Sequence, residues 1–509
     1  MKPPPINRIL QEIVKLKNNS LQQKLVRAPY IQDEVLKKLL SKAKRTEFGK
    51  HYDFRSILKS RNLIESYRKK VPVFDYVKMK DEWWHHSLRG EMDISWPGKI
   101  QYFALTSGTS DASSKYVPVS DDMIKAIRKT GTRQILSLPD LDISPEIYTK
   151  SILMLGGSSK LTNALDYKVG DLSGIMISKL PLWIQNFYKP GKKISDIKEW
   201  PQKIDEIVRN ASQWDIGIIS GVPSWVQLLI QKVIEYYKVE NIHKVWPNFS
   251  IYVHGGVSFK PYEKSFDHLL GKKITYLETY LASEGFFAIE KGKNKNAMEL
   301  VLDIGVFYEF VPFNENNFDA NGVMRPNAEI LSLNSVQTGI DYALLVSTCS
   351  GAWRYQIGDT IRFTSISNFE IIVTGRTKHF LSICGEHLSI DNLDTAISKL
   401  SEKFNLDVNE YGVAGQLTEN GVEHTWYLGS NGTAQAKSLL EFIDQTLIEI
   451  NDDYATERKS VLKKLKLKIL PLSTFYEFMK LNNKEGGQHK FPRVLKGTML
   501  EKWNQYLKK

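Results

Sequence analysis

Residues 251–256 read Ile-Tyr-Val-His-Gly-Gly, a short apolar run that ends in a glycine-bearing turn. Similar apolar runs occur at residues 216–220 and 342–347, and between residues 101 and 363 such runs alternate with longer periodic segments. This alternation predicts an α/β architecture, in which sheets are flanked by helices. Ligands of such sheets gather at the carboxyl ends of the strands, so binding residues are expected in the turns that follow the runs.

The two ends of the chain have a different character. The first hundred residues indicate helices, because apolar residues recur at the spacing of one helical face at Leu36, Leu39, Leu40 and Ala43. A strand-like run at 370–374 ends in Gly-Arg-Thr-Lys, and the chain beyond it has the size of one small domain. We therefore expect a large domain at 1–374, a hinge at 375–378 and a smaller, mobile α+β domain at 379–509.

Two patterns predict elements of the small domain. Ser389 is suited to cap the N-terminus of a helix, since an apolar stripe of helical period follows it. Residues 464–469 alternate lysines with apolar residues, which predicts a half-buried strand with a lysine face.

Composition limits the class of protein. The chain has 509 residues, of which 42% are hydrophobic and 25% charged, as in ordinary globular proteins. No run approaches the roughly 20 apolar residues of a membrane span, and residues 1–17 lack the apolar core of a signal peptide, so a cytoplasmic protein is expected. Cys349 and Cys384 stand alone, which favours reduced thiols over a zinc site or a disulfide. The net charge of +12 favours anionic metabolites over nucleic acid, because no nucleic-acid-binding signature accompanies it.

The strongest local signal is a hydroxyl-rich loop at residues 106–115, Thr-Ser-Gly-Thr-Ser-Asp-Ala-Ser-Ser-Lys. Its hydroxyls and backbone amides can donate hydrogen bonds to phosphate oxygens, while Lys115 balances their charge. The loop lacks the Gly-Lys-Ser/Thr ending of a Walker loop. A polar surface turn is the alternative that the loop alone leaves open.

Two later segments offer groups that suit the rest of a nucleotide. Tyr280 provides an aromatic face for a base, and Glu284, four residues on, provides a carboxylate of the kind that Mg²⁺ takes on nucleotides. Glu284 could equally be a charge at a helix N-terminus. Asp359 follows Gly358 and could accept hydrogen bonds from both ribose hydroxyls, although a Gly-Asp pair is often only a turn.

In their order and spacing these segments resemble the adenylate-forming superfamily of acyl-CoA synthetases, luciferases and peptide-synthetase adenylation domains. The resemblance is greater to the auxin-responsive Gretchen Hagen family of acyl-acid amido synthetases and their bacterial relatives. It covers nearly the whole chain, since it includes residues 46–50 and 71–73 upstream and Gln-His-Lys-Phe-Pro-Arg at 488–493. It implies the adenylate-forming ligase fold, with a large adenylation domain and a mobile small domain.

The resemblance also implies roles for individual residues. The catalytic set is Lys490, Glu284 and Lys115, with Glu284 also linked to magnesium. The hinge includes Arg376 and Lys378. The implied nucleotide-binding residues are Ser107, Gly108, Thr109, Ser110, Gly255, Gly256, Tyr280, Ser283 and Asp359. The chain departs from the family pattern at Asp111, in the phosphate loop, and at His387, where plant members tend to have lysine.

The implied activity is that of an ATP-dependent acyl-acid amido synthetase. Such an enzyme converts a small carboxylic acid to an acyl-AMP with release of pyrophosphate, then transfers the acyl group to an amine, expected to be an amino acid. A carboxylate needs this activation because attack by an amine would otherwise have to expel oxide. ATP and Mg²⁺ are the expected cofactors, and a monomer without a nucleic-acid or membrane partner is expected. Transfer to coenzyme A, and nucleotide binding without turnover, remain as alternatives, and the sequence identifies neither the acid nor the amine.

Overall fold

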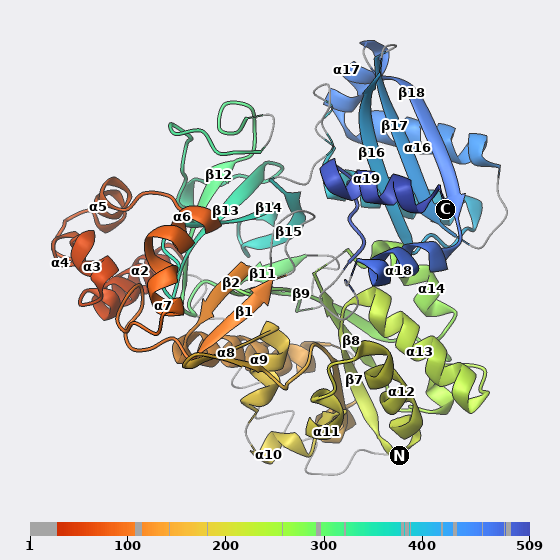
Figure 1. Cartoon of the computed structure of the whole chain (residues 1–509), viewed down its shortest axis with the longest axis horizontal. Helices are drawn as coiled ribbons and strands as arrows, with labels where there is room; N and C mark the ends of the chain where they lie inside the picture. Colours follow the sequence, from red (N-terminus) through yellow and green to blue (C-terminus); the bar gives the residue numbers. More distant parts are fainter. Residues whose placement is uncertain are drawn as a thin grey trace.

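The computed structural model (Figure 1) describes residues 28–106, 115–141, 143–180, 182–256, 258–291, 297–319, 322–377, 381, 386, 388–418, 421–430, 435–460, 462–482, 484 and 490–508. The α/β class predicted from the sequence is confirmed. The segment after residue 388, drawn in blue, has its own sheet and lies beside α13 (Pro223–Tyr237) and α14 (Lys260–Asp267). In the described part of the chain, no helix is long and apolar enough to cross a membrane.

Within the described ranges, an eleven-stranded sheet has the order β12-β13-β14-β15-β11-β10-β9-β8-β7-β3-β6. The strands from β6 to β9 pair in parallel, whereas those from β9 to β12 pair in antiparallel fashion. The strands are β3 (Ser151–Leu155), β6 (Tyr188–Lys189), β7 (Ile216–Gly221), β8 (Ile251–Gly255), β9 (Thr275–Ala282), β10 (Gly285–Ile289), β11 (Met298–Leu300), β12 (Val306–Pro312), β13 (Asp341–Thr348), β14 (Tyr355–Ser365) and β15 (Glu370–Arg376). The three apolar runs used to predict the class lie in β7, β8 and β13.

A smaller sheet, in the order β2-β1-β5-β4, carries the strands on either side of the hydroxyl-rich loop. Strands β1 and β2 are antiparallel, and Thr106 at the end of β1 pairs with Lys115 at the start of β2. Residues 107–114 between them lie outside the described residues. The strands of this sheet are β1 (Tyr102–Thr106), β2 (Lys115–Val119), β4 (Thr162–Ala164) and β5 (Tyr167–Gly170).

Helices cover the parallel half of the large sheet. On α12 and α13 the buried faces pack against one another, and the rings of Trp200 and Trp225 meet edge to face at 5.1 Å. Helix α12 spans Trp200–Asn210. The remaining helices between residues 121 and 335 are α8 (Asp121–Ser137), α9 (Leu172–Ser178), α10 (Leu182–Gln185), α11 (Lys192–Ser195), η3 (Leu138–Asp140), η4 (Pro145–Thr149), η5 (Ala211–Gln213), η6 (Ile242–Lys244) and η7 (Leu333–Ser335). Of these, α8 contacts β10 and η7 contacts β12, both in the antiparallel half.

N-terminal helices pack against the antiparallel half of the sheet. The predicted helical stripe is confirmed, since Leu36, Leu39, Leu40 and Ala43 are all buried. Gln32 fixes the helix by donating to the carbonyl of Val306 at 3.1 Å and accepting from Tyr308 N at 2.8 Å. The helices are α2 (Ala28–Ala43), α3 (Glu47–His51), α4 (Phe54–Ile57), α5 (Leu63–Lys70), α6 (Tyr76–Met79), η2 (Lys80–Trp84) and α7 (His85–Leu88).

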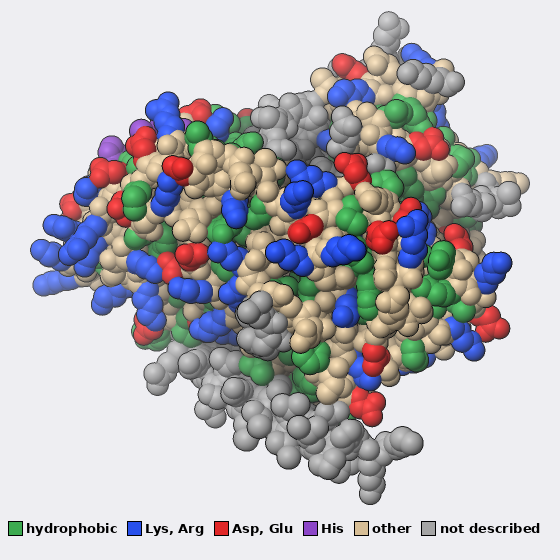
Figure 2. Space-filling model, turned by 60° about the horizontal axis from the view of Figure 1, so that its bottom comes forward, with side chains coloured by type: hydrophobic (Ala, Val, Ile, Leu, Met, Phe, Trp, Pro, Cys, Tyr) green, Lys and Arg blue, Asp and Glu red, His purple; other side chains and the backbone are tan. Residues whose placement is uncertain are grey.

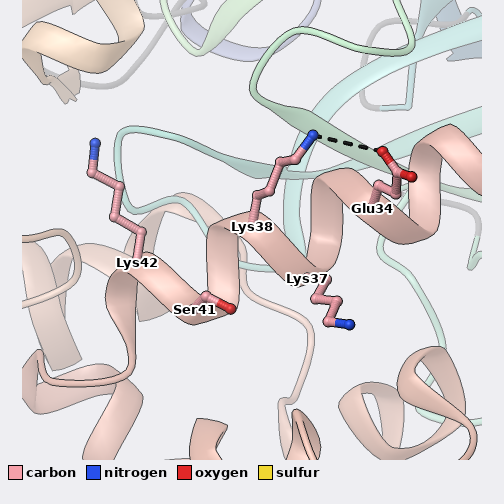
Figure 3. Close-up of a pocket in the computed structure, with 5 residues that line it drawn as sticks. All are labelled: Glu34, Lys37, Lys38, Ser41 and Lys42. Atoms are coloured by element: carbon pink, nitrogen blue, oxygen red, sulfur yellow. Dashed lines mark ion pairs between the residues drawn. The ribbon is translucent and has the colours of Figure 1, made fainter.

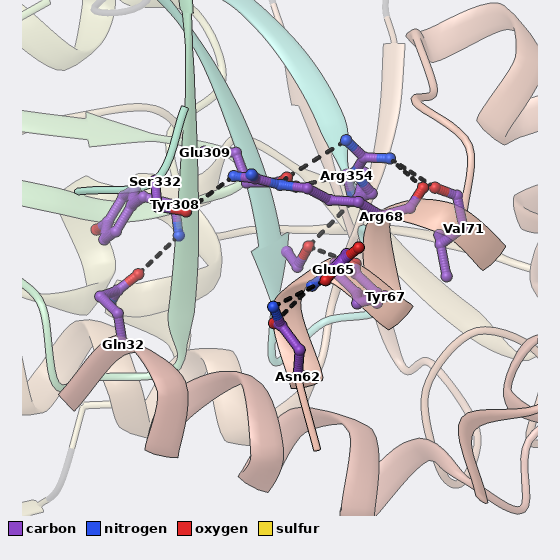
Figure 4. A network of polar contacts seen from close by, with 11 residues as sticks. Gln32, Asn62, Glu65, Tyr67, Arg68, Val71, Tyr308, Glu309, Ser332 and Arg354 are labelled. Carbon is purple, nitrogen blue, oxygen red and sulfur yellow. Dashed lines mark hydrogen bonds and ion pairs between the residues drawn. The ribbon is translucent and has the colours of Figure 1, made fainter. Parts of the chain in front are cut away.

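A buried ion-pair network joins α5 to the sheet (Figure 4). Arg354 donates from Nε to Glu309 Oε2 at 2.9 Å, and Arg68 donates from Nε to Glu309 Oε1 at 2.7 Å. Arg354 also donates to the carbonyls of Arg68 and Val71. Because Glu309 is 1% exposed, its charge is compatible with burial only while these cations accompany it. The network thereby fixes the start of the strand that carries Asp359.

The C-terminal segment has its own three-stranded sheet, in the order β16-β17-β18, and its own core. The predicted helix is confirmed as α15, where Ser389 Oγ accepts from Asn392 N in a capping box. The predicted lysine-faced strand is confirmed as β18. The elements are α15 (Ile390–Phe404), β16 (Glu410–Thr418), β17 (Gly421–Gly429), α16 (Ala436–Ile450), α17 (Asp452–Ser460), β18 (Leu462–Leu470), α18 (Leu472–Leu481) and α19 (Gly497–Tyr506).

At the expected hinge, the strand is longer than the sequence pattern indicated. β15 continues through Gly375 and Arg376, which pair with Thr360 and Asp359 of β14. Lys378 lies outside the described residues.

Candidate active site

A cavity of about 1360 Å³ lies between the large sheet and the C-terminal segment. One wall comes from β8, β9 and β14 and the turns at their ends. The other wall comes from α15 and from residues 490–499. The site residues predicted from the sequence that line it are Lys115, Gly256, Tyr280, Ser283, Glu284, Asp359, Arg376 and Lys490.

Asp359 is held from two sides. Tyr280 Oη donates to Asp359 Oδ2 at 2.7 Å, and Arg376 Nε donates to Asp359 Oδ1 at 2.8 Å. The open alternative that Gly-Asp is only a turn is wrong, since Asp359 lies within β14; its neighbour Gly358 has a φ of +93°, which a residue without a side chain tolerates best. A carboxylate offers about four acceptor positions, so about two remain for a ligand.

Tyr280 lies in the middle of β9 and is 7% exposed. Its ring packs edge to face on Phe287 at 5.0 Å, and its hydroxyl is occupied by Asp359. The residue therefore connects the wall of the cavity to the Asp359 carboxylate.

Lys490 reaches the cavity from the C-terminal segment. Its Nζ donates to the carbonyl oxygen of Gly256, in the turn that follows β8. Gly256 has a φ of +81°, a backbone conformation that favours glycine. A Cβ there would stand 2.6 Å from Lys490 Nζ, so a larger residue would also displace the end of that flexible side chain. Burial, and then the nearby Arg376, lower the pKa of Lys490 to about 8.

Glu284 lies in the tight turn between β9 and β10, and the turn also contains Ser283. The alternative reading of Glu284 as a helix N-terminal charge is therefore wrong. Burial, and to a smaller extent Asp359, raise the pKa of this carboxyl, whereas Lys115 and Arg376 act in the opposite direction. Lys115 Nζ lies 5.2 Å from the centre of the Tyr76 ring, in the same cavity. A carboxylate with a lysine beside it can receive a metal–phosphate group.

The remaining predicted residues have other places. Gly255 ends β8, and a Cβ there would lie 2.4 Å from the carbonyl oxygen of Thr279, so this glycine permits close strand packing. Outside the described residues lie Ser107, Gly108, Thr109, Ser110, Asp111, Lys378, Cys384 and His387. Cys349 is buried, as expected of a structural thiol.

Several residues of the cavity were missed by the sequence interpretation. Arg493, three residues beyond Lys490, donates to Glu410 Oε2 at 2.7 Å and to Tyr262 Oη at 3.2 Å, so it ties the C-terminal segment to α14. Arg376 was expected only at the hinge, yet it is bound to Asp359. His254, Glu278 and Glu290 also line the cavity. Glu278 is the only charged residue in the strand at 275–282, and this was a signal that could have drawn attention to it.

Comparison with models of protein families identifies the family of this chain. Models of the GH3 family match along its length: the N-terminal domain at residues 17–160 and 158–274, the central domain at 299–371 and the C-terminal domain at 391–498. The chain belongs to the GH3 family. The resemblance inferred from the sequence motifs is thereby confirmed.

Curated relatives of this GH3 chain are synthetases. It is 22% identical to the indole-3-acetic acid-amido synthetase GH3.4 of Arabidopsis thaliana, over 93% of this chain and 90% of the relative. It is 24% identical to the jasmonoyl-L-amino acid synthetase JAR6 of Nicotiana attenuata, over 47% of this chain and 42% of the relative.

Solved structures share the GH3 fold. The acyl acid amido synthetase GH3.15 superposes with a TM-score of 0.77 at 16% identity, covering 97% of this chain and 96% of the other. A 2-hydroxyisobutyryl-CoA ligase in complex with 2-HIB-AMP superposes with a TM-score of 0.60 at 13% identity, covering 94% and 92%. The adenylate-forming ligase fold expected from the sequence is thus confirmed.

A second pocket of this GH3 chain is formed by α2 alone (Figure 3). Its lining residues, Glu34, Lys37, Lys38, Ser41 and Lys42, are all exposed and belong to one helix. The pair Lys38–Glu34 spans 3.6 Å with both side chains largely in solvent, so it adds little stability. Lys and Arg side chains also gather at the end of the molecule formed by the N-terminal helices (Figure 2). The pocket on α2 does not bring together residues from different elements as the large cavity does.

Proposed function

We propose that this GH3 protein is an ATP-dependent acyl-acid amido synthetase. It adenylates a small carboxylic acid, releases pyrophosphate and transfers the acyl group to an amine, the expected acceptor being an amino acid. The observation that carries the proposal is the convergence of Lys490 with Asp359, Glu284 and Lys115 on one cavity. A protein that only binds nucleotide has little need of a lysine brought in from a separate C-terminal segment.

The nucleotide would lie along the ends of β8, β9 and β14. Asp359 has acceptor positions left for the two ribose hydroxyls, and Tyr280 and Gly256 line the wall beside it for the base. Lys115 and the preceding loop would bind the phosphates. The donor set fits magnesium, because the carboxylate of Glu284 lines the same cavity as Lys115, and nucleotide-bound Mg²⁺ takes one or two carboxylates. When bound, Mg²⁺ neutralises phosphate charge during displacement at the α-phosphate.

Lys490 would act on the adenylation step. Attack of a carboxylate on the α-phosphate brings two anions together, and a fixed ammonium stabilises that transition state. The hydrogen bond from Lys490 to Gly256 holds the ammonium at the end of β8, in the same cavity as Asp359. Lysine suits the task because it is a compact point charge.

For the amide-forming step we propose that the small domain at 379–509 turns on the large domain at 1–374 about a hinge at 375–378 that includes Arg376 and Lys378. The contacts of Arg493 and Glu410 with Tyr262, which join the small domain to α14, would then exchange between two orientations. The enzyme is proposed to work as a monomer in the cytoplasm, because both walls of the cavity come from one chain and ATP is available there.

The test is a screen of carboxylic acids for acid-dependent exchange of pyrophosphate into ATP, repeated with amino acids and with coenzyme A while the products are identified by mass spectrometry. The proposal expects exchange with at least one acid, and amide formation with an amino acid. Thioester as the sole product would replace the amine by coenzyme A as acceptor. Absence of exchange with every acid, despite AMP binding, would favour a nucleotide-binding protein without turnover.

A further inference from the structure

Three titratable residues lie side by side on or just beyond neighbouring strands of the large sheet, next to the residues proposed to bind the nucleotide. His254 on β8 is the register partner of Glu278 on β9. Glu290, just beyond β10, donates from its backbone N to the carbonyl of Glu278 at 2.9 Å and accepts from Glu278 N with Oε2 at 2.8 Å. All three line the large cavity.

These three residues face the same side of the sheet as the proposed nucleotide site. Glu278 and Tyr280 are two residues apart on one strand, so their side chains share a face. Two residues of strand span about 7 Å, which places Glu278 next to, and not within, the wall that holds Asp359. A group bound at Glu278 would therefore lie beside the proposed nucleotide site, in the same cavity.

The charge of this region suits a cation. Asp391 and Asp394 of α15 face Glu278 from the C-terminal segment, and both raise its pKa. On the positive side, Lys260 of α14 faces both Glu278 and Asp394, and Arg493 faces Asp394 while bound to Glu410. Arg362 of β14 pairs with Asp391 at 3.7 Å. Carboxylates thus outnumber cations around these three residues, in contrast to the neighbouring wall with Arg376 and Lys490.

His254 gives a second, independent sign of a ligand. It is 5% exposed and lines the cavity, and its buried Nδ1 has no hydrogen-bond partner in the described part of the protein. Burial lowers the pKa of His254 to about 3, so the ring is neutral and does not oppose a bound cation. A buried polar atom without a partner costs stability unless a ligand or water completes it.

We propose that Glu278, with His254 and Glu290 beside it, binds the acceptor amine as its ammonium ion and takes the proton that the amine must lose before it attacks. This inference rests on the proposed function. The nitrogen lone pair then forms the C–N bond to the acyl carbon while the bond from that carbon to the phosphate oxygen breaks. AMP leaves with the electron pair, and the second amine proton passes to its phosphate, so charge and atoms balance.

Burial and the neighbouring Glu290 raise the pKa of Glu278 to about 7. A carboxylate with this pKa accepts a proton at neutral pH far more readily than an ordinary glutamate does. The neighbouring carboxylates that attract the ammonium ion therefore also raise the pKa of Glu278, which makes it a more effective base.

The experiment compares the parent with Glu278→Gln, using benzoate, indole-3-acetate and jasmonate as acids and glycine, L-lysine, 1,4-diaminobutane and hydroxylamine as acceptors. Hydroxylamine is mostly unprotonated at neutral pH, so it needs neither ammonium binding nor proton removal. Glu278→Gln should keep pyrophosphate exchange and hydroxamate formation, but lose amide formation with the other amines by on the order of a hundredfold. The ratio of amide to hydroxamate does not depend on the fraction of the variant that is folded. Glu278→Asp should partly restore this ratio, because it keeps a carboxylate. Glu235→Gln, on the exposed surface, is the matched control and should leave the ratio unchanged.

Equal losses of amide and hydroxamate in Glu278→Gln, or no loss of amide, would overturn the assignment of Glu278 while leaving the proposed function intact. No exchange in the parent with any of the acids would count against the proposed function itself, and the inference would fall with it.

Discussion

Replacing Asp359 by alanine should weaken AMP binding by a factor that follows from its contacts. Two of the roughly four acceptor positions of the carboxylate are taken by Tyr280 and Arg376, which leaves two for the ribose hydroxyls. A hydrogen bond to a charged acceptor contributes about 1.5 kcal/mol at the lower end of the measured range. Two of them amount to about 3 kcal/mol, or roughly a hundredfold in Kd.

The assay is calorimetric titration of AMP and of 2′-deoxy-AMP into the parent and the Asp359→Ala variant. The parent should bind 2′-deoxy-AMP about tenfold more weakly than AMP, since one hydrogen bond is lost. The variant should not distinguish the two nucleotides. Tyr280→Phe is the matched control, because it removes one bond to Asp359 but keeps the carboxylate and the ring. If Asp359→Ala binds AMP as tightly as the parent, or still discriminates between the nucleotides, the ribose assignment is wrong.

Three other perturbations test separate parts of the structure. Glu284→Gln should slow Mg-ATP-dependent adenylation by at least about tenfold while changing the affinity for AMP little, because the metal matters only when the outer phosphates are present. An equal loss of adenylation rate and of AMP affinity would indicate a structural role of Glu284. The rate of acid-dependent pyrophosphate exchange should be constant at lower pH and fall as the pH rises through about 8, because Lys490 loses its proton there. In Lys490→Arg the rate should fall only at a higher pH, since arginine stays protonated. If the pH profile of this variant is the same as that of the parent, another group is responsible for the titration. Arg354→Ala should lower the free energy of unfolding, measured in urea titrations, by about 3–5 kcal/mol, because Glu309 stays buried with only Arg68 beside it. The control Arg55→Ala, at an exposed position, should change the free energy of unfolding little. Similar effects of the two substitutions would contradict a stabilising role of the network.

Local patterns predicted local structure well. The stripe around Leu36, the cap at Ser389 and the alternation at 464–469 each depend on neighbours in sequence, and each corresponds to the predicted element. Helix and strand periodicity act within a few residues, so no knowledge of packing is needed.

Contacts across the fold were beyond the reach of such patterns. The bond between Arg376 and Asp359 depends on the register of β14 and β15, and that between Lys490 and Gly256 joins residues 234 apart in the chain. The motif around Lys490 indicated a role but not its partner. The sequence shows Glu278 as a lone charge in its strand, but only the strand pairing brings His254 and Glu290 beside it.

The central claim is that the acid is activated as an acyl-AMP, and isotope transfer tests it most directly. The acid that supports pyrophosphate exchange is labelled with ¹⁸O in its carboxylate and incubated with the protein, ATP, Mg²⁺ and the amine, and the products are analysed by mass spectrometry. Because the acid attacks the α-phosphate and AMP later leaves with the bridging oxygen, one ¹⁸O atom should appear in AMP for each amide formed, with unlabelled pyrophosphate. Label in inorganic phosphate together with ADP, or unlabelled AMP, would contradict adenylation.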